Sequence, residues 1–174
     1  FISRVRWTGS GTPLPDNTEG AMGLLRRIIS TDAPASVVLI RLLVGGVYLS
    51  EGIQKFLYPE LRGAGRFSTL GIPSPEFFGP FVGVVEIACG ALILLGLLTR
   101  LAVVPTLVIM AVAVYTTQLP VLEKEGFWFM ANRIRTDYSM VLGAVFLLLV
   151  GGGRWSLDYA VGRRGGAGVR GDHT

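Results

Sequence analysis

The sequence predicts an all-α membrane protein in which four transmembrane helices form an up-down bundle. Its 174 residues are 51% hydrophobic and only 16% charged, whereas soluble domains carry about 25% charged residues. The mean hydropathy is +0.56, and the apolar residues are spread over four stretches. Each stretch approaches the roughly 20 residues that a helix needs to cross a bilayer. Because a helix satisfies its own backbone groups in lipid, we expect the four to pack as a bundle.

We expect the spans at residues 37–57, 77–98, 101–119 and 138–152. The fourth is short, and we expect it to begin near Thr136 and to continue towards Trp155. Only Thr99 and Arg100 separate the second span from the third, so these two helices should be antiparallel neighbours. The loop at 58–76 contains several prolines and glycines and is expected to be irregular, whereas the loop at 120–137 carries an aromatic cluster suited to the headgroup layer.

Composition divides the chain into three parts. Residues 1–33 form a polar arm with a basic juxtamembrane segment around Arg26 and Arg27, which is either a short interfacial helix or a simple anchor. Residues 34–159 form the membrane domain. Residues 160–174 form a basic, glycine-rich tail that we expect to be disordered or to contact anionic lipid headgroups.

The basic residues near the spans predict the orientation of the bundle. On the side of the two termini they are Arg26, Arg27, Arg100, Arg154, Arg163 and Arg164. On the opposite side they are Arg62, Arg66, Lys124, Arg133 and Arg135. This small excess favours cytoplasmic N- and C-termini, with the bundle in a cytoplasmic membrane. Trp128 and Trp155 are expected to anchor the protein at the two membrane interfaces.

The composition argues against several classes of protein. The net charge of +4 does not indicate nucleic-acid binding, because the basic residues flank apolar runs where the positive-inside effect explains them. The single cysteine, Cys89, leaves no thiol pair, and the single histidine, His173, stands next to the end of the chain. We therefore expect no metal site, no covalently bound cofactor and no haem held by two histidines of this chain.

Polar side chains within the spans are the candidate functional residues, because charge in lipid is costly and usually faces the bundle interior. At 100° per residue, Arg41, Tyr48 and Lys55 share one face of the first span, and Glu51 lies at its edge. Glu86 should lie near mid-bilayer. The predicted intramembrane polar cluster comprises Arg41, Tyr48, Glu51, Gln54, Lys55, Glu86 and Asp137.

Glycines accompany these charges on the first two spans. Glycines three and four residues apart share one helical stripe and permit close approach of a second helix. The predicted helix-packing residues are Gly45, Gly52, Gly79, Gly83 and Gly90.

The polar cluster has three alternative uses. In the first, the charges neutralise one another and hold the bundle together: Glu51 and Lys55 are spaced to pair along one helix, and Arg41 and Glu51 lie at depths from which either can approach Glu86. In the second, the cluster lines a pocket that holds a quinone headgroup or a lipid, or that passes a proton. In the third, it docks partner subunits.

Several ordered blocks resemble the DoxX family of small bacterial membrane proteins. The stretch from Arg41 to Phe56 is similar to the family's opening Arg…Gly…Gly-x-x-Lys-Phe signature, with Gly52 and Lys55 at its end. Gly71-Ile-Pro, Val85-Glu-Ile-Ala-Cys-Gly and Gly96-Leu-Leu-Thr-Arg resemble the second block, and Gly153-Arg-Trp-Ser-Leu-Asp is similar to the closing motif. Glu51 stands where many members have a histidine.

The resemblance implies the fold more strongly than the function. The family takes its name from a relationship to small membrane subunits (DoxD type) of a thiosulfate:quinone oxidoreductase, and other members are associated with membrane oxidoreductase assemblies. We favour a non-catalytic accessory subunit of a respiratory or photosynthetic electron-transfer complex. The alternatives are a quinone-reducing subunit of the thiosulfate:quinone type, which needs a redox partner, and a small-molecule or proton-handling protein that uses Glu51 and Glu86. The expected partners are membrane lipid and a larger complex or further copies of the chain.

Overall fold

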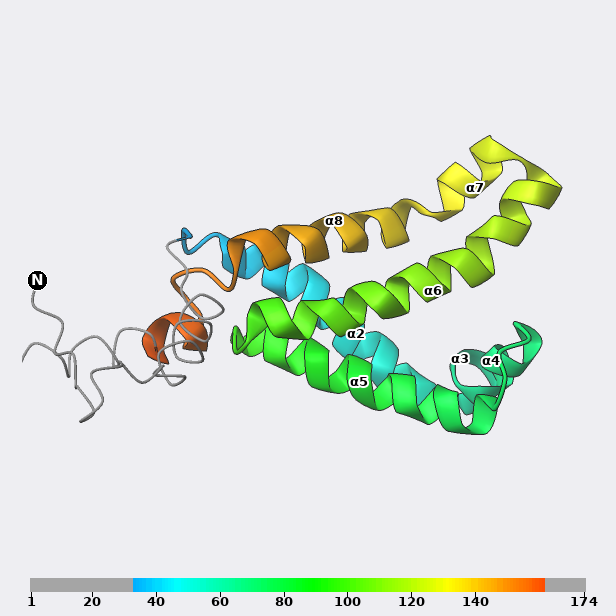
Figure 1. Cartoon of the computed structure of the whole chain (residues 1–174), viewed down its shortest axis with the longest axis horizontal. Helices are drawn as coiled ribbons and strands as arrows, with labels where there is room; N and C mark the ends of the chain where they lie inside the picture. The colour runs from blue at the N-terminus through cyan, green and yellow to red at the C-terminus, as the bar shows by residue number, and fades with distance from the viewer. Residues whose placement is uncertain (1–32, 162–174) are drawn as a thin grey trace, which may run out of the picture.

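The computed structural model describes residues 33–161, and every regular element in that part of the chain is a helix. The elements are α2 (Val37–Leu57), α3 (Pro59–Arg62), α4 (Ala64–Thr69), α5 (Pro75–Leu95), α6 (Thr99–Glu125), α7 (Phe127–Arg133) and α8 (Arg135–Val150). The four long helices run along one direction, while α3 and α4 on one side and α7 on the other occupy the same end (Figure 1). The all-helical prediction is confirmed.

The four long helices form a ring in which each packs on its neighbours in an up-down order. The most extensive contact is between α2 and α5, and the ring continues from α5 to α6, from α6 to α8 and from α8 back to α2. At the end where α2 begins, all four lie together. Towards the opposite end, α2 and α5 diverge from α6 and α8 (Figure 1). We call these two ends the closed end and the open end.

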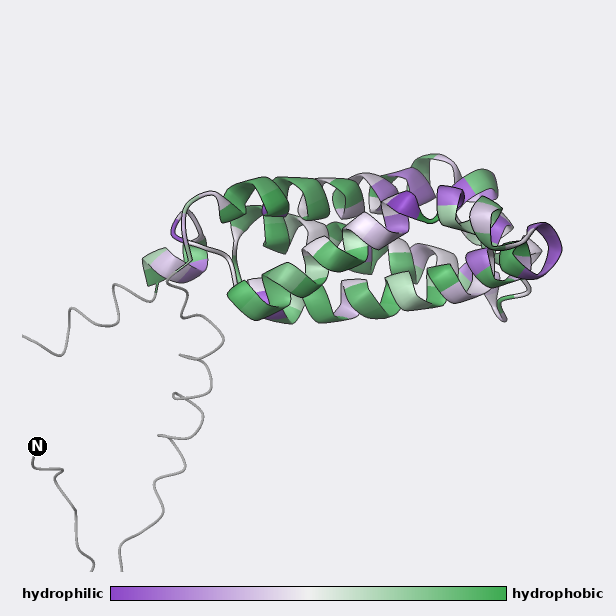
Figure 2. Ribbon diagram, turned by 90° about the horizontal axis from the view of Figure 1, so that it is seen from above, coloured by the Kyte–Doolittle hydropathy of each residue, from purple (hydrophilic) through white to green (hydrophobic). Residues whose placement is uncertain are grey.

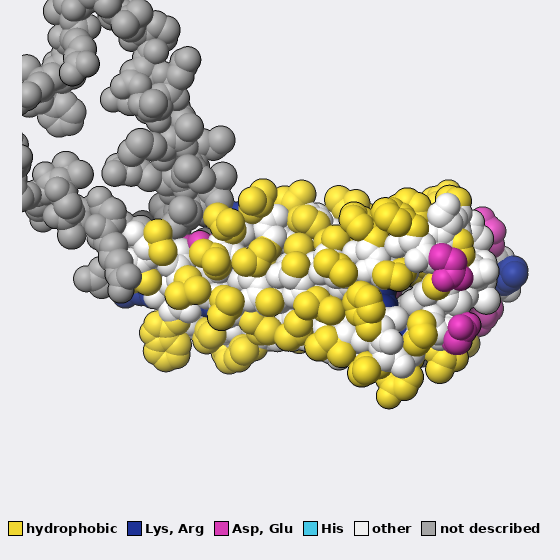
Figure 3. Space-filling model, turned by 90° about the horizontal axis from the view of Figure 1, so that it is seen from below, with side chains coloured by type: hydrophobic (Ala, Val, Ile, Leu, Met, Phe, Trp, Pro, Cys, Tyr) yellow, Lys and Arg dark blue, Asp and Glu magenta, His cyan; other side chains and the backbone are white. Residues whose placement is uncertain are grey.

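Apolar side chains cover the outside of the bundle as well as its core. Hydrophobic residues line the flanks, and hydrophilic residues gather at the ends (Figures 2 and 3). The fully buried core includes Val44, Ile93, Val103 and Leu147. Three helices, α2, α5 and α6, are long and apolar enough to cross a membrane. The helix α8 has 16 residues, fewer than the roughly 20 of a typical span.

Two predicted boundaries are wrong, each for a local reason. The predicted turn at Thr99 and Arg100 belongs to α6, because α5 already ends at Leu95, where Gly96 takes a left-handed conformation (φ 68°). The third helix also continues past the predicted end at Leu119, through Pro120 to Glu125. A proline inside a membrane helix removes one hydrogen bond but does not end the helix where neighbouring groups compensate.

The two loops are more regular than predicted. Pro59 and its fixed φ start α3 at the first helical turn, Gly63 separates α3 from α4, and most of the 120–137 segment belongs to α6, α7 and α8. The basic segment around Arg26 and Arg27, for which an interfacial helix or a simple anchor is expected, and the tail after residue 161 lie outside the described residues.

Candidate functional site

The guanidinium group of Arg41 joins three segments at the closed end. Arg41 is 3% exposed. Its Nε donates to the carbonyl oxygen of Ile93 (2.9 Å) and its Nη2 to that of Leu94, at the end of α5. Its Nη1 donates to the carbonyl oxygens of Gly152 (3.2 Å) and Trp155 (2.5 Å), after α8. One positive charge on α2 thus ties the end of α5 to the segment after α8, and a positive charge suits the carbonyl-bearing end of a helix.

The carboxylate of Asp158 supplies the matching contact at a helix N-terminus. Its oxygens accept hydrogen bonds from the backbone N–H groups of Leu98 (2.8 Å) and Thr99 (3.1 Å) and from the Thr99 hydroxyl (3.2 Å). The residue before α6, Leu98, has a left-handed backbone and offers no side-chain cap of its own. Asp158 therefore caps α6 from 60 residues away, where a negative charge also complements the helix dipole.

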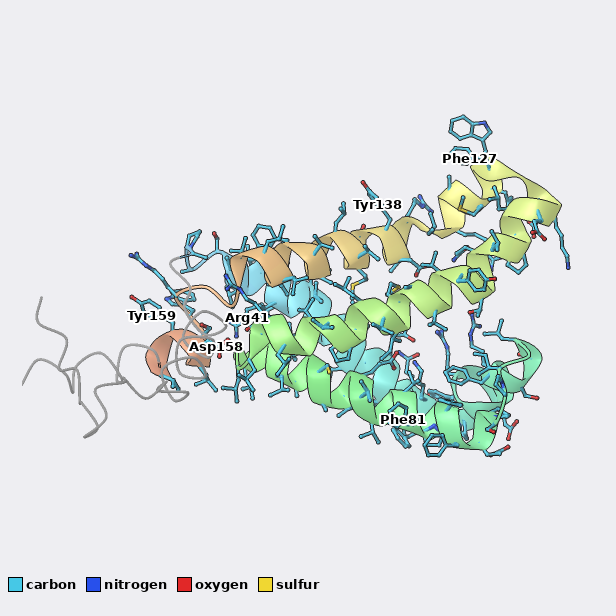
Figure 4. The ribbon with its side chains drawn as sticks, viewed as in Figure 1. Arg41, Phe81, Phe127, Tyr138, Asp158 and Tyr159 are labelled. Atoms are coloured by element: carbon cyan, nitrogen blue, oxygen red, sulfur yellow. The ribbon has the colours of Figure 1, made fainter. Side chains whose placement is uncertain are left out.

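Arg41 and Asp158 meet around Gly96 (Figure 4). A Cβ atom at Gly96 would lie 2.6 Å from Cζ of Arg41 and 2.5 Å from Cβ of Ser156, and the positive φ already disfavours any other residue. The Asp158 carboxylate is also close enough to interact with the Arg41 charge. The closed end is consequently a compact polar lock built from α2, the α5–α6 turn and the segment after α8.

The second charged contact inside the bundle is an ion pair between α2 and α5. Nζ of Lys55 lies 2.6 Å from Oε2 of Glu86, and both side chains are largely buried. The predicted pairing of Lys55 with Glu51 and the predicted approach of Arg41 to Glu86 are therefore wrong. Glu51 does lie within electrostatic reach of Glu86. It also lies 3.7 Å from Arg62 of α3, with both side chains about half exposed.

The direction of the side chains explains why Lys55 reaches Glu86. The helices α2 and α5 are antiparallel, with Gly52 against Gly83 at one level and Gly45 against Gly90 at another. Side chains tilt towards the N-terminus of their own helix, so Lys55 and Glu86 tilt towards each other. Arg41 lies about 21 Å from Lys55 along α2 and is held at the closed end.

Tyr48 and Asp137 extend this polar region towards α6 and α8. The Tyr48 hydroxyl donates to the carbonyl oxygen of Thr106 on α6 (3.0 Å) and lies within electrostatic reach of both Glu86 and Asp137. Gln118 of α6 donates through Nε2 to Oδ2 of Asp137 (2.9 Å), in the first turn of α8. The structure therefore divides the predicted cluster between the closed end, with Arg41, and the open half, with Tyr48, Lys55, Glu86 and Asp137.

The remaining predicted residues occupy more peripheral places. Gln54 points to the outside of α2, where its Nε2 donates to Oγ of Ser50 (3.0 Å). Trp128 on α7 and Trp155 after α8 are 84% and 71% exposed, at opposite ends of the bundle. Both positions match those of interfacial anchors.

The predicted glycines lie at close backbone contacts. A Cβ at Gly52 would meet the carbonyl oxygen of Gly83 at 2.7 Å, and one at Gly90 would meet the backbone nitrogen of Leu49 at 2.7 Å. Gly79 faces α4 instead, where a Cβ would lie 2.7 Å from the nitrogen of Ala64. The contact between α2 and α5 from Gly45 to Gly52, about two helical turns, thus depends on hydrogen atoms in place of side chains.

Within residues 33–161, no group of three or more His, Cys, Asp or Glu side chains is arranged to hold a metal ion. Cys89 is buried among the apolar residues of the core. The side chains that make polar contacts in the described bundle carry carboxylate, amide, hydroxyl, ammonium and guanidinium groups.

Comparison with known proteins agrees with the family resemblance of the sequence blocks. The DoxX family model matches residues 36–119. The uncharacterized membrane protein Rv3486 of Mycobacterium tuberculosis is 54% identical over 144 residues, which are 79% of this chain and 88% of the relative. The chain belongs to the DoxX family. No solved structure matches it.

Four contact residues of this DoxX protein were missed by sequence reasoning: Thr99, Thr106, Gln118 and Asp158. Thr106 and Gln118 lie in the third apolar stretch, where single uncharged polar residues give little signal against lipid-facing neighbours. Asp158 had a signal, since it ends the Gly153–Asp158 block that resembles the DoxX closing motif. The group that it contacts, the N-terminus of α6, is visible only in three dimensions.

Proposed function

We propose that this DoxX-family protein is a non-catalytic structural subunit of a membrane electron-transfer assembly. The observation that carries the proposal is the use of the buried charges. The Arg41 guanidinium donates hydrogen bonds to four backbone carbonyls, and Lys55 and Glu86 form an ion pair with each other. Groups that hold helices together in this way stabilise one arrangement of the bundle, which is what a subunit that braces an assembly requires.

The electron-transfer context rests on the family. Members of the DoxX family are associated with membrane oxidoreductase assemblies. The blocks that carry the resemblance contain the residues of the polar lock and of the ion pair: Arg41, Lys55 and Glu86 lie in the first two blocks, and Asp158 ends the last. A protein that braces such an assembly needs a rigid bundle and an outer surface for its neighbours. It needs no redox group of its own.

We also propose that α8 is a fourth span and that both termini lie on the cytoplasmic side of a bacterial inner membrane. In support, α8 packs against α6 and α2, and Leu142, Val145, Phe146 and Leu149 are exposed on it. Sixteen residues rise about 24 Å, and the segment Gly151–Gly153 continues to the Arg41 lock. Acidic residues gather at the open end (Figure 3), and the small arginine excess near the closed end favours the cytoplasm there.

The test is purification of the tagged chain from its native membrane in a mild detergent, followed by identification of the proteins that copurify. We expect stable comigration with the subunits of an electron-transfer complex. The matched control is the Arg41→Met variant, in which the opened bundle should lose those partners. Purification of this chain without any other subunit would contradict the proposal.

A second candidate function is the binding of a quinone headgroup or lipid, or the handling of a proton, in the open half. It is favoured by the convergence of Tyr48, Lys55, Glu86 and Asp137 from three helices, and by the buried Oε1 of Gln118, which has no hydrogen-bond partner. The Glu86→Gln variant tests it through quinol-linked turnover in membranes. A loss of turnover in a stably folded variant supports this function, and unchanged turnover removes Glu86 from the mechanism.

A further inference from the structure

The outer face of α2 carries a groove that the bundle does not fill. It has a volume of about 420 Å³ and is lined by Leu42, Leu43, Gly46, Val47, Ser50 and Glu51. The glycines of the inner face of α2, Gly45 and Gly52, press against the backbone of α5. Gly46 is different, because a Cβ built on it would meet nothing within 4 Å. The helix therefore has one small-residue face that α5 covers and a second that nothing in residues 33–161 covers.

Ser50 lines the groove, and Gln54 follows it one helical turn later, so the two form a polar pair at the edge of the groove. Nε2 of Gln54 donates to Oγ of Ser50 (3.0 Å) at an exposed position. Ser50 lies about 10 Å below the end of α2, within the depth of a span. Uncharged polar groups at this depth gain by pairing across helices, since lipid offers them no partner. The Ser50 hydroxyl retains its proton to donate, and Oε1 of Gln54 remains able to accept.

The Ser50–Gln54 pair can form hydrogen bonds with the same pair in a second copy of the chain. If a second α2 lies against the groove across a two-fold axis, the Ser50 hydroxyl can donate to Oε1 of the partner's Gln54, and the reverse bond forms by symmetry. Gly46, Ser50 and Gln54 are spaced by four residues, the spacing at which two membrane helices cross closely with small residues at the contact. At the rim, the ion pair of Glu51 with Arg62 is about half exposed, so both charges remain accessible to a second copy.

We propose that the α2 groove is the interface of a symmetric homodimer, in which Gly46 allows the two helices to approach and Ser50 and Gln54 form a reciprocal hydrogen-bonded clasp. A second copy always brings the matching donor and acceptor to the same level of the membrane. The dimer goes beyond the proposed structural function and does not depend on it. A chain that purifies alone as a dimer would contradict the electron-transfer assembly and leave the dimer standing.

Disulfide crosslinking in native membranes tests the dimer. In a Cys89→Ala background, Gly46→Cys places a thiol at the proposed crossing point, where two backbones lie near enough for a disulfide. The matched control is Val108→Cys on α6, which is 59% exposed and hence more accessible than the half-buried Gly46. After mild oxidation we expect a band of twice the chain mass for Gly46→Cys, at least tenfold stronger than for Val108→Cys. Equal crosslinking at both positions, or a crosslink to a different protein, would overturn the proposal.

A second measurement does not require a new thiol. The mass of the wild-type protein and of the Gly46→Leu and Val108→Leu variants is determined by light scattering in a mild detergent. We expect the wild type and Val108→Leu to be dimers, and Gly46→Leu to dimerise at least tenfold more weakly while it unfolds at the wild-type temperature. A wild-type monomer both in detergent and in lipid nanodiscs would show that only lipid fills the groove, and would overturn the proposal.

Discussion

Arg41 and Asp158 act on helix ends of opposite polarity within one small region. The guanidinium meets carbonyls at the end of α5 and after α8, and the carboxylate meets N–H groups at the start of α6. Each charge therefore lies where the helix dipoles favour its sign. Both residues are almost fully buried, so each also satisfies backbone groups that water does not reach.

Replacement of Arg41 by Met should destabilise the protein strongly. The variant keeps most of the side-chain volume but removes the donor of four hydrogen bonds to carbonyls at the closed end. We expect the free energy of unfolding to fall by about 2–4 kcal/mol, measured by denaturant titration in detergent micelles. The control is Arg154→Met, which changes an exposed side chain at the same end. Equal stability of the two variants would show that Arg41 does not hold the closed end.

Replacement of Asp158 by Ala should remove the cap of α6. The loss of an N-terminal cap costs about 1–2 kcal/mol, and Asp158→Asn should lose less because one side-chain oxygen can still accept a hydrogen bond. Hydrogen exchange offers the local measurement: the amides of Leu98 and Thr99 should exchange faster in Asp158→Ala than in the control Glu123→Ala. Unchanged exchange at both amides would contradict the cap.

At the residue scale, the sequence identifies the charged residues that are costly to bury in lipid, but some of the partners predicted for them are wrong. Arg41, Lys55 and Glu86 are noticeable because charges are rare within the spans. Their partners depend on quantities that the sequence does not contain. The tilt of side chains along two antiparallel helices selects Lys55 rather than Arg41 for Glu86. The return of the chain after α8 brings two backbone carbonyls within hydrogen-bond distance of Arg41.

At the scale of elements, α2 is distinguished by its two faces. Gly45 and Gly52 let it approach α5 to backbone contact, whereas Gly46 opens onto the outer groove. The spacing of the glycines predicts that they pack helices, but it does not say which face each one serves. That assignment depends on the rotation of α2 about its own axis, which the packing against α5 and α8 determines.

Two alanine substitutions in α2 should therefore differ in their effect. In Gly52→Ala the new methyl group would lie 2.7 Å from the carbonyl oxygen of Gly83, so the two helices must separate. Such overpacking costs about 1–3 kcal/mol. In Gly46→Ala the methyl group meets nothing, and the higher helix propensity of alanine should leave the stability unchanged or slightly raised. Thermal unfolding in detergent compares the pair. Equal destabilisation would contradict the close contact of α2 with α5.

The short helix α8 shows how far element length can be read from the sequence. The apolar stretch predicts a span that begins near Thr136, and the helix begins at Arg135 and ends at Val150. The extension towards Trp155 is not helical, because Gly151 and Gly153 adopt positive φ angles and the chain turns there to meet Arg41. The chain cannot both turn after Val150 to meet Arg41 and continue as a longer fourth helix.

At the scale of the whole molecule, the proposed topology places the two ends of α8 on opposite sides of the membrane. In a Cys89→Ala background, a membrane-impermeant maleimide should label Lys124→Cys at the open end of α6 on intact cells. It should label Arg154→Cys only after the membrane is permeabilised. Labelling of both positions on intact cells would show that α8 does not cross, and the reversed pattern would reverse the orientation.

The bundle as a whole combines a lipid-exposed surface with a few charges that fasten its interior. The low charge content and the four apolar stretches predict the helical membrane fold because lipid imposes the same demand on every spanning helix. The divergence of α2 and α5 from α6 and α8 is not predicted. It arises because Arg41 and Asp158 join all four helices at the closed end, whereas Lys55–Glu86 and Gln118–Asp137 each join only two.

The central claim is that the buried charges hold the bundle and do no chemistry. A double-mutant cycle on Lys55 and Glu86 tests it most directly, with unfolding and copurification of partner subunits measured for Lys55→Met, Glu86→Leu and the double variant. Each single variant leaves one buried charge unpaired and should lose about 3–5 kcal/mol. The apolar double variant should recover most of that loss and retain its partners. A double variant that is as stable as the wild type, yet abolishes the activity of the assembly, would contradict the claim.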